Sequence, residues 1–446
     1  MIRFRFTLLC GALLLLSGCE TLNDMTSWMG SDTEKDPLPG KRLSVLSDLS
    51  HLTPDESLAS TNISVPAVTQ NTDWREGGGA PAGLTGNLAL SGFSHHDDVK
   101  IGDHNGWEQP LYPDPIVAGG AVYAMDAKGY ITAHSAANIS KILWTNKSAV
   151  TEDEADLLGG GLAFDSGRIY VTSGRGKLFA LDANTGKEIW KQNPGVSLRA
   201  APKALNAKVY AVSVDNQLFA YDASSGTPLW NHRGANESAG FVAAATPAAT
   251  DTIVIAPYSS GEIHAVDTVG GQDVWSDTLL LARRNSATGV FSGIAGNPLV
   301  KDDIVYAGGS SGFFAAIALI NGRRMWEQNI STLNTPWIAD DFIYVLSNDD
   351  ELACLLRADG RVKWVKQLPQ YGNEKKSKDP LVWRGPVMAN GQLLIAGMHG
   401  KMLALSPKDG TTFSTVDIPD NISDAPIVAG GKLYFLTQDA RLHVIY

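Results

Sequence analysis

The residues best suited to metal chemistry lie together in SGFSHHDDVKIGDH, residues 91–104. Imidazole and carboxylate groups are common ligands of divalent metal ions. The candidates in this stretch are His95, His96, Asp97, Asp98 and His104. Their spacing matches no known ligand motif, and they lie in a long Gly-rich insertion. We therefore expect a surface loop here rather than a metal site.

Other chemical motifs are absent from the sequence or weak. There is no GxxxxGK[ST] phosphate loop and no HExxH zinc pair. A charged run at Lys375, Lys376 and Lys378 is typical of a solvated loop. The sequence therefore predicts no catalytic residue, no metal and no cofactor.

The start of the chain is a targeting sequence. Two arginines precede an apolar run that ends in LSGC, residues 16–19, which is the order of a secretory signal rather than a membrane span. Small residues before a cysteine resemble a bacterial lipobox. Residues 1–18 are thus expected to be removed as a lipoprotein signal and Cys19 to be lipidated; a plain signal cut elsewhere is the alternative. Glu20 after the cysteine favours the outer membrane, facing the periplasm.

Charge and cysteine content narrow the class of protein further. The net charge of the 446 residues is −11, or −13 once the two signal arginines are removed. An acidic surface of this kind repels nucleic acid. In the mature chain Cys354 is the one cysteine besides Cys19, so no intramolecular disulfide is expected between free thiols. Cys354 lies in an apolar strand run, where a buried inert thiol is expected.

Residues 19–71 are rich in Ser, Thr, Asp and Pro and show no sustained periodicity. We expect them to form a flexible tether with a reach of roughly 40 Å. Such a tether would let a folded body hang from a membrane and meet partners.

A recurring hairpin organises the rest of the chain. FALDANTGKEIW (179–190) is followed about forty residues later by FAYDASSGTPLW (219–230), and further copies end at three later tryptophans. In each copy a glycine lies four residues before the tryptophan. The glycine suits a turn with positive φ, and the tryptophan is expected to fill the gap between neighbouring units. The closing aromatics are Trp144, Trp190, Trp230, Trp275, Trp326, Trp364 and Phe413.

Each unit reads as four short antiparallel strands, which is the pattern of a propeller blade. Opening strands are expected near residues 113, 159, 200, 246, 297, 335, 385 and 425, so residues 72–446 are predicted to form an all-β, eight-bladed propeller. The eighth unit ends at Tyr446 after three strands. We expect an N-terminal strand, TDWRE with Trp74 in the closing position, to supply the fourth and remove the open sheet edge.

These AxDxxTGxxxW repeats resemble the quinoprotein-type, or PQQ-like, eight-bladed propellers. With its lipobox and acidic tether, the chain from Cys19 to Tyr446 is similar to the BamB family of outer-membrane lipoproteins. The resemblance implies a non-enzymatic scaffold that binds the periplasmic POTRA region of BamA, the barrel subunit of the β-barrel assembly complex. It also implies a role in folding and inserting outer-membrane β-barrels, with the rest of the complex and unfolded barrel proteins as further partners.

The resemblance further implies that loops on one face, between the early and middle blades, carry the contact with BamA. The matching stretches here are SLRAAP, HRGANESAGF and LLLARRNSATGVF, and which of them is the true counterpart stays open. An arginine beside exposed apolar residues suits an interface anchor, and a solvated loop arginine is the alternative. The implied contact residues are Leu198, Arg199, Arg233, Glu237, Phe241, Arg283, Arg284 and Phe291.

Two other functions use the same fold. PQQ-dependent dehydrogenases resemble this chain in their repeats but often carry an adjacent Cys-Cys disulfide over the cofactor, which Cys354 alone cannot form. A periplasmic glycan-binding propeller is the second alternative, since Trp107, Trp337 and Trp383 would suit a sugar. Of these, Trp337 and Trp383 lie close to opening strands and are expected to pack in the core.

Overall fold

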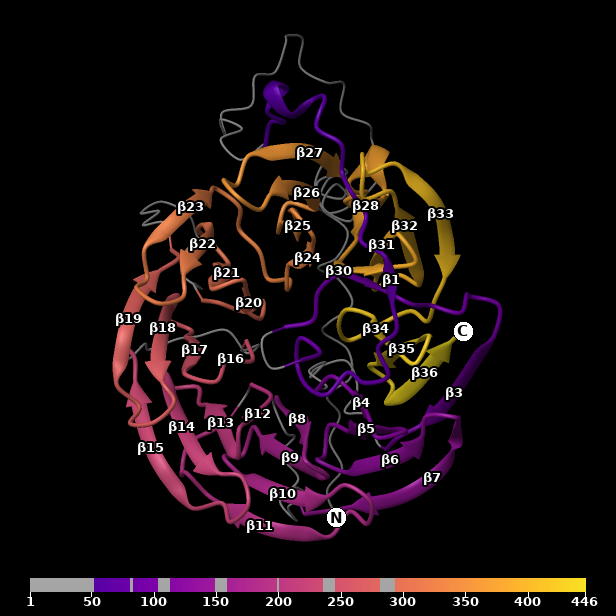
Figure 1. Cartoon of the computed structure of the whole chain (residues 1–446). Helices are drawn as coiled ribbons and strands as arrows, with labels where there is room; N and C mark the ends of the chain where they lie inside the picture. Colours follow the sequence, from indigo (N-terminus) through magenta and orange to yellow (C-terminus); the bar gives the residue numbers. More distant parts are fainter. Residues whose placement is uncertain are drawn as a thin grey trace, which may run out of the picture. The chain divides into compact units, whose positions relative to one another are not determined.

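The computed structural model describes residues 52–80, 83–102, 113–148, 159–198, 200–235, 245–280 and 293–446. The unit from Ser50 to Tyr446 is an all-β propeller whose eight antiparallel sheets follow one another around a central axis in these ranges (Figure 1). The predicted eight-bladed fold is confirmed. Each blade begins beside the axis, in six of the eight with a strand of only two or three residues, and ends at the rim with an edge strand.

The first four blades have the following strands. Blade 1 contains β4 (Ile116–Ala118), β5 (Ala121–Met125), β6 (Ile131–Ser135) and β7 (Asn138–Asn146). Blade 2 contains β8 (Gly160–Asp165), β9 (Arg168–Ser173), β10 (Leu178–Asp182) and β11 (Glu188–Gln192). Blade 3 contains β12 (Lys203–Leu205), β13 (Lys208–Val212), β14 (Gln217–Asp222) and β15 (Pro228–Arg233). Blade 4 contains β16 (Ala248–Ala249), β17 (Ile253–Pro257), β18 (Glu262–Asp267) and β19 (Asp273–Thr278).

The later blades repeat this arrangement. Blade 5 contains β20 (Leu299–Lys301), β21 (Ile304–Gly308), β22 (Phe314–Ala318) and β23 (Arg324–Gln328). Blade 6 contains β24 (Trp337–Ala339), β25 (Phe342–Leu346), β26 (Glu351–Leu356) and β27 (Val362–Gln367). Blade 7 contains β30 (Trp383–Ala389), β31 (Gln392–Gly397), β32 (Lys401–Leu405) and β33 (Thr412–Asp417). Blade 8 contains β34 (Ile427–Ala429), β35 (Lys432–Thr437), β36 (Arg441–Ile445) and β3 (His96–Lys100).

Outside the blades, the described residues form four further short strands and two 3-10 helices. They are β1 (Val68–Thr69), β2 (Asn87–Leu88), β28 (Tyr371–Asn373), β29 (Lys378–Pro380), η1 (Glu56–Leu58) and η4 (Glu374–Lys376). Strands β1 and β2 extend the sheet of blade 7, and β28 and β29 form a hairpin of their own. Among the described residues no helix is long and apolar enough to cross a membrane.

The blades pack through the tryptophans of the repeat, as predicted. At each seam from blades 1–2 to blades 6–7, the tryptophan of one outer strand lies on the turn glycine of the next blade. Trp190 is typical: its Nε1 donates to the Ala223 carbonyl over 3.0 Å, and only 8% of its surface is exposed. A Cβ on Gly226 would come within 2.6 Å of the Trp190 ring, and the φ of Gly226 is +73°. Only glycine fits this turn beneath the indole.

A tyrosine on the second strand reinforces several of these seams. Tyr123 and Trp144 both donate to the carbonyl of Ala183, over 3.3 and 2.8 Å. Their rings lie 5.7 Å apart. Burial of Tyr123, with the nearby Asp182, raises the pKa of its phenol to about 12. The phenol therefore keeps its proton and remains a hydrogen-bond donor at the seam.

The last seam differs from the prediction. The closing strand of blade 8 is β3, which pairs with β36, so the prediction that TDWRE would supply it was wrong. Trp74 instead bridges to Val117 beside the axis. The expectation of a loop at 95–98 was also wrong, because His96–Lys100 forms the β3 strand; His104 lies outside the described residues. Phe413 is 57% exposed and fills no gap, because it lies one residue before the tryptophan position of the repeat: Ala404 pairs with Ser414, as Ala180 pairs with Trp190.

The segment that precedes β3 forms an inner ring, residues 71–91, beside the central axis. Its described residues meet the blades in order, from a hydrogen bond between Asn71 and Gly430 in blade 8 to another between Ser91 and Gly431 of the same blade. In between it contacts Val117, Phe164, Lys203, Thr246, Leu299, Ile338 and Ala389, which belong to blades 1 to 7 in turn. The ring therefore ties all eight blades together at their innermost strands.

The end of the predicted tether is part of the folded body. The Asp55 amide donates to the Val362 carbonyl over 2.8 Å, and Leu58 is buried. Lys363 contacts the Leu58 carbonyl and donates to the Ala59 carbonyl over 3.0 Å. Residues 52–71 thus lie against the propeller, which shortens the expected tether at its C-terminal end. Residues 19–51 lie outside the described residues.

Candidate functional site

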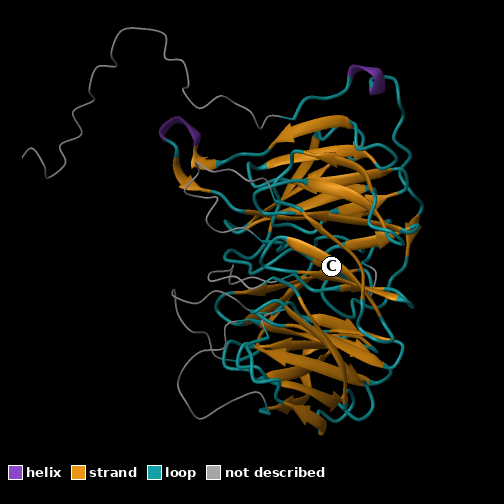
Figure 2. Ribbon diagram, turned by 90° about the vertical axis from the view of Figure 1, so that its left-hand side faces the viewer, coloured by secondary structure: helices purple, strands orange, loops and turns teal. Residues whose placement is uncertain are grey.

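The propeller has two faces with different kinds of connection. One face, here called the turn face, carries the tight turns between first and second strands and the repeated hairpins between third and fourth strands. The opposite face, the loop face, carries the connections from the fourth strand of one blade to the first strand of the next, because antiparallel strands alternate in direction. In Figure 2, η4 and its hairpin project on the loop face, and η1 lies on the turn face.

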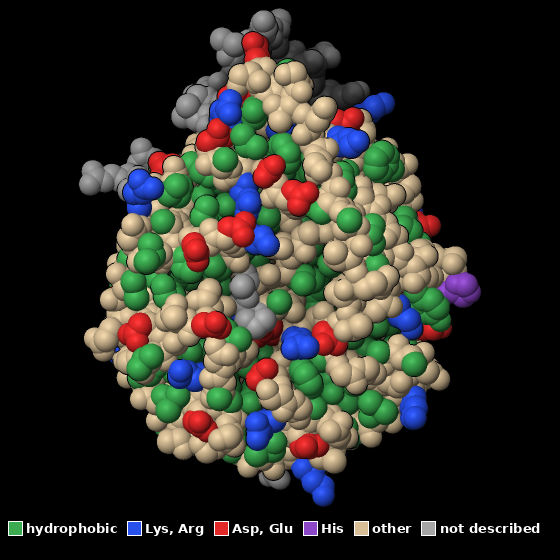
Figure 3. Space-filling model, viewed as in Figure 1, with side chains coloured by type: hydrophobic (Ala, Val, Ile, Leu, Met, Phe, Trp, Pro, Cys, Tyr) green, Lys and Arg blue, Asp and Glu red, His purple; other side chains and the backbone are tan. Residues whose placement is uncertain are grey.

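The turn face offers little that is specific. Figure 3 looks onto it and shows Lys and Arg interspersed with Asp and Glu, with apolar side chains scattered between them. Its hairpins are held by their own aspartates. Hydrogen bonds from Ser224 and Ser225 lower the pKa of Asp222 to about 2, so this turn is fixed by a charged carboxylate. These hydrogen bonds therefore stabilise the hairpin itself.

The loop face opens into a central cavity of about 250 Å³. Its lining comes from the loop-face ends of the first strands of all eight blades, from Pro113 in blade 1 to Ile427 in blade 8. Trp74, Gly78 and Leu84 of the inner ring also line it. The inner ring therefore narrows the axial channel to a small pocket.

A buried ion pair anchors the ring below this cavity. Glu76 and Lys203 are 1% and 2% exposed, and Lys203 Nζ lies 3.5 Å from Glu76 Oε1. Lys203 also donates to the Gly77 carbonyl over 3.2 Å, and Glu76 accepts from the Ala204 amide over 3.3 Å. Burial raises the pKa of Glu76 and lowers that of Lys203, in each case against the attraction of the partner. The pair belongs to the architecture, since the two charges face each other and each group also bonds to the backbone.

The electrostatics of the cavity do not suit a quinone cofactor. Pyrroloquinoline quinone carries three carboxylates, which need cationic partners. The described lining contains Arg384 beside two carboxylates, Asp114 and Asp424. Burial and the Asp424 carboxylate raise the pKa of Asp114 well above its ordinary value, against the opposing effect of Arg384. A lining that already crowds carboxylates together does not fit a tricarboxylate.

The predicted aromatic and thiol residues belong to the core. Trp337 and Trp383 are each 3% exposed, so the expectation that they pack was confirmed. Trp107 lies outside the described residues. Cys354 is buried, and burial raises the pKa of its thiol far above its ordinary value. The thiol is therefore inert, as expected.

The candidate contact residues fall in three successive connections of the loop face. These connections join β11 to β12, β15 to β16 and β19 to β20. Arg233, at the end of β15, is exposed. Leu198 is fully buried among core residues between blades 2 and 3, so its side chain supports its connection and has no surface for a partner. Six candidates lie outside the described residues: Arg199, Glu237, Phe241, Arg283, Arg284 and Phe291.

Sequence reasoning missed one cluster of chemically capable side chains. His232, His264 and Asp273 lie on three different strands and meet at the seam between blades 3 and 4. Each occupies a position where the repeat has other residues in neighbouring blades. An alignment of the repeat sequences, which compares WNHR, HAVD and QDVW with the same positions of the other blades, would have revealed these three residues.

The fold is that of a PQQ-like propeller. Its axial channel is narrowed by the inner ring, and its loop face carries the connections between blades. The crystal structure of BamB from Moraxella catarrhalis is similar, with a TM-score of 0.65 and 22% identity over 78% of this chain and 98% of that one. A quinohemoprotein alcohol dehydrogenase from Comamonas testosteroni also has a TM-score of 0.65, at 12% identity, covering 84% of this chain and 81% of that one. At these identities the likenesses establish the fold alone.

Sequence comparison identifies the family. The family model described as outer membrane protein assembly factor BamB matches residues 127–366, so the chain belongs to that family. BamB of Salmonella typhimurium strain LT2 is 28% identical over 339 residues, which cover 74% of this chain and 83% of that protein. BamB of Escherichia coli strain K12 is 27% identical with the same coverage.

Proposed function

We propose that this chain is a lipoprotein scaffold of the outer-membrane β-barrel assembly machinery. In this proposal Cys19 carries the lipid that anchors it to the outer membrane, facing the periplasm. The loop face binds the periplasmic POTRA region of BamA and so helps the complex fold and insert β-barrel proteins. Membership of the BamB assembly-factor family carries the proposal.

The arrangement of the loop face supports a protein contact there. Three successive connections between blades 2 and 5 contain the candidate residues, apart from Arg233 at the end of β15, and alternating strand direction sends these connections to one side. Arg233 is exposed at the start of the middle one. An exposed arginine suits pairing with a carboxylate of a partner, because arginine forms bidentate bonds to carboxylates.

The cavity argues against a catalytic role. Its volume is about 250 Å³, and the inner ring occupies the channel beside it. The carboxylates of Asp114 and Asp424 disfavour an anionic cofactor. We therefore propose a non-enzymatic protein, although the dehydrogenases share its fold.

The test is a binding titration. Soluble mature chain with Cys19→Ser is titrated with the periplasmic region of BamA by calorimetry, beside a triple Ala variant at Arg199, Arg233 and Arg283. The matched control is Arg323→Ala, an exposed arginine on the turn face. We expect saturable binding that weakens at least about tenfold in the triple variant, the effect of about 1.4 kcal/mol, and is unchanged in the control.

Two results would count against the proposal in different ways. Equal binding by the triple variant and the parent would move the contact away from these arginines. No binding by the parent would remove BamA as the partner. An absorbance band beyond the tryptophans in the purified chain would instead favour a cofactor and an enzyme.

A further inference from the structure

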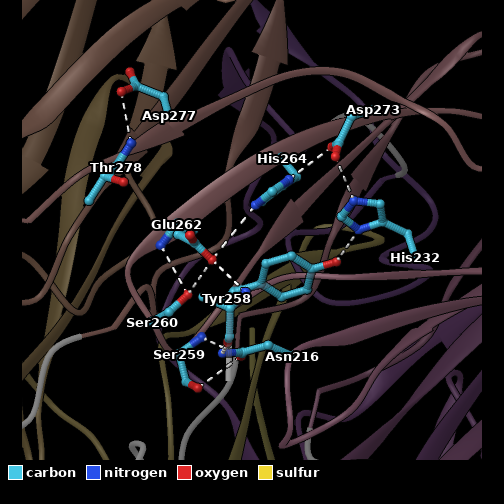
Figure 4. Close-up of polar contacts among 11 residues, drawn as sticks. Asn216, His232, Tyr258, Ser259, Ser260, Glu262, His264, Asp273, Asp277 and Thr278 are labelled. Carbon is cyan, nitrogen blue, oxygen red and sulfur yellow. Dashed lines mark hydrogen bonds and ion pairs between the residues drawn. The ribbon is translucent and has the colours of Figure 1, made fainter. Parts of the chain in front are cut away.

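The seam between blades 3 and 4 differs in chemistry from its neighbours. His232 lies on β15 of blade 3, and His264 and Asp273 lie on β18 and β19 of blade 4 (Figure 4). By strand register, the equivalent residues at the seam between blades 1 and 2 are Asn146, Phe179 and Glu188. The repeat itself therefore does not require two imidazoles and a carboxylate at this place.

The three side chains already point at one another. His232 Nε2 lies 3.0 Å from Asp273 Oδ2, and His264 Nδ1 lies 2.9 Å from Asp273 Oδ1. One ligand atom from each of the three residues lies within 4.8 Å of the others. A tetrahedral zinc ion with bonds of about 2.0–2.2 Å needs its ligand atoms roughly 3.3 Å apart. The Asp273 side chain is 50% exposed, so small side-chain rotations would close this geometry.

Each imidazole also has an acceptor for the proton on its far nitrogen. His232 Nδ1 lies 2.8 Å from the Tyr258 hydroxyl. His264 Nε2 faces Glu262 Oε2 at 3.7 Å, and Glu262 is held by the Ser260 hydroxyl and the Ala235 amide over 3.0 and 2.8 Å. Carboxylate or hydroxyl groups behind a ligating histidine fix its tautomer and strengthen it as a ligand. The cluster therefore has the outer partners of a metal site as well as the ligands.

One nitrogen of the cluster is left without a hydrogen bond. His264 Nε2 is buried and makes no hydrogen bond to any described residue. When Nδ1 of neutral His264 donates to Asp273, the lone pair of Nε2 must face the Glu262 carboxylate. A metal ion on Nδ1 would move the proton to Nε2, where Glu262 can accept it. Metal binding would thus supply the contact that His264 lacks.

We propose that His232, His264 and Asp273 bind one zinc-class divalent ion, which cross-links blades 3 and 4. Two imidazoles and one carboxylate suit zinc among the biological cations, and the exposed side of Asp273 leaves room for water as a fourth ligand. The ion would join an outer strand of one blade to two strands of the next. It would act as a structural clamp at the rim, independently of any partner on the loop face.

The test is zinc binding by the soluble mature chain with Cys19→Ser. We expect calorimetry to show one saturable equivalent of zinc and no binding of magnesium, a cation that prefers oxygen ligands. A hundredfold excess of zinc over its Kd should raise the unfolding temperature by about 3 °C. Cobalt in place of zinc should give the visible absorption of a tetrahedral nitrogen and oxygen site.

Two variants separate this site from adventitious binding. His264→Phe, which places the residue found in blade 2 at this position, should abolish the zinc equivalent while keeping cooperative unfolding. Glu262→Gln should weaken zinc binding by about 10-fold to 100-fold, because it acts only through His264. His443→Phe, in another blade, is the matched control and should bind as the parent does. No saturable binding to the parent, or undiminished binding to His264→Phe, would overturn the proposal.

Discussion

Two regions hold the blades together, and they do so in opposite ways. At the rim, the same tryptophan and glycine contact is repeated at six described seams from blade 1 to blade 7. Beside the axis, the inner ring of residues 71–91 meets the blades through several kinds of contact: backbone hydrogen bonds, an ion pair and close packing of its glycines. A repeated sequence motif encodes the rim contacts, whereas a single segment of the chain makes all the ring contacts.

The difference has a physical origin. Each rim contact joins two neighbours, so one residue pattern serves every seam and duplicated units bring it with them. The ring contacts successive blades with successive residues of one largely irregular segment, and each contact must suit a different neighbour. At Gly83, with φ +92°, a Cβ would lie 2.1 Å from the Leu299 side chain. Because each of these fits is specific to one place, the residues of the inner ring show no repeating pattern in the sequence.

The largest effect is expected at the rim. Trp190→Ala should lower the free energy of unfolding by about 4 kcal/mol, because it removes a buried indole, leaves a cavity and breaks the bond to Ala223. Urea unfolding followed by circular dichroism measures the change. Phe413→Ala is the matched control: with 57% of its surface exposed, its loss should change stability by less than about 0.5 kcal/mol. Similar losses for both variants would contradict the seam assignment.

This contrast also explains what the sequence could and could not predict. The eight blades, their opening strands and the packing of the repeat tryptophans between neighbouring blades follow from spacing alone. The identity of the closing strand could not be predicted from spacing. Trp74 resembles the closing tryptophans of the repeat, whereas HHDDVK has no such tryptophan and resembles a polar loop. Its pairing depends on contacts across more than 340 residues, such as His96 with His443.

The candidate sites were predictable to a smaller extent. Family resemblance led to three connections of the loop face, but it could not reveal that Leu198 is buried, since a leucine beside an arginine reads the same in either case. The cluster of His232, His264 and Asp273 was missed because its members are 9 to 41 positions apart and belong to different blades. Only the register of the sheets brings them together.

A smaller effect is expected from the ring. Lys203→Met would leave the Glu76 carboxylate buried with only the Ala204 amide for support, which should cost about 3 kcal/mol of stability. Adding Glu76→Gln should restore at least half of this loss, because the double variant has no uncompensated charge. Urea unfolding of the two single variants and the double variant forms a cycle. Additive losses would show that the ring is not anchored by this pair.

The smallest effect concerns the seam where the ring ends and β3 closes blade 8. Burial, reinforced by the nearby His96, lowers the pKa of His443 from its ordinary 6.5 to about 4; Asp98 and Asp439 oppose this shift and Arg441 adds to it. The folded state thus prefers neutral His443. Its contribution to stability is complete above pH 6.5 and is lost as the pH falls towards 4, at no more than about 1.4 kcal/mol per pH unit.

His443→Phe tests this contribution, since phenylalanine occupies the same position in blades 2 and 3. The stability of the parent should fall between pH 6.5 and 4, and the variant should lose less over the same range. The turn carboxylates do not interfere, because their lowered pKa values, about 2 for Asp222, place their losses at more acid pH. If the stability of the parent and of the variant changed in parallel with pH, the charge of His443 would have no effect on the stability of the closing strand.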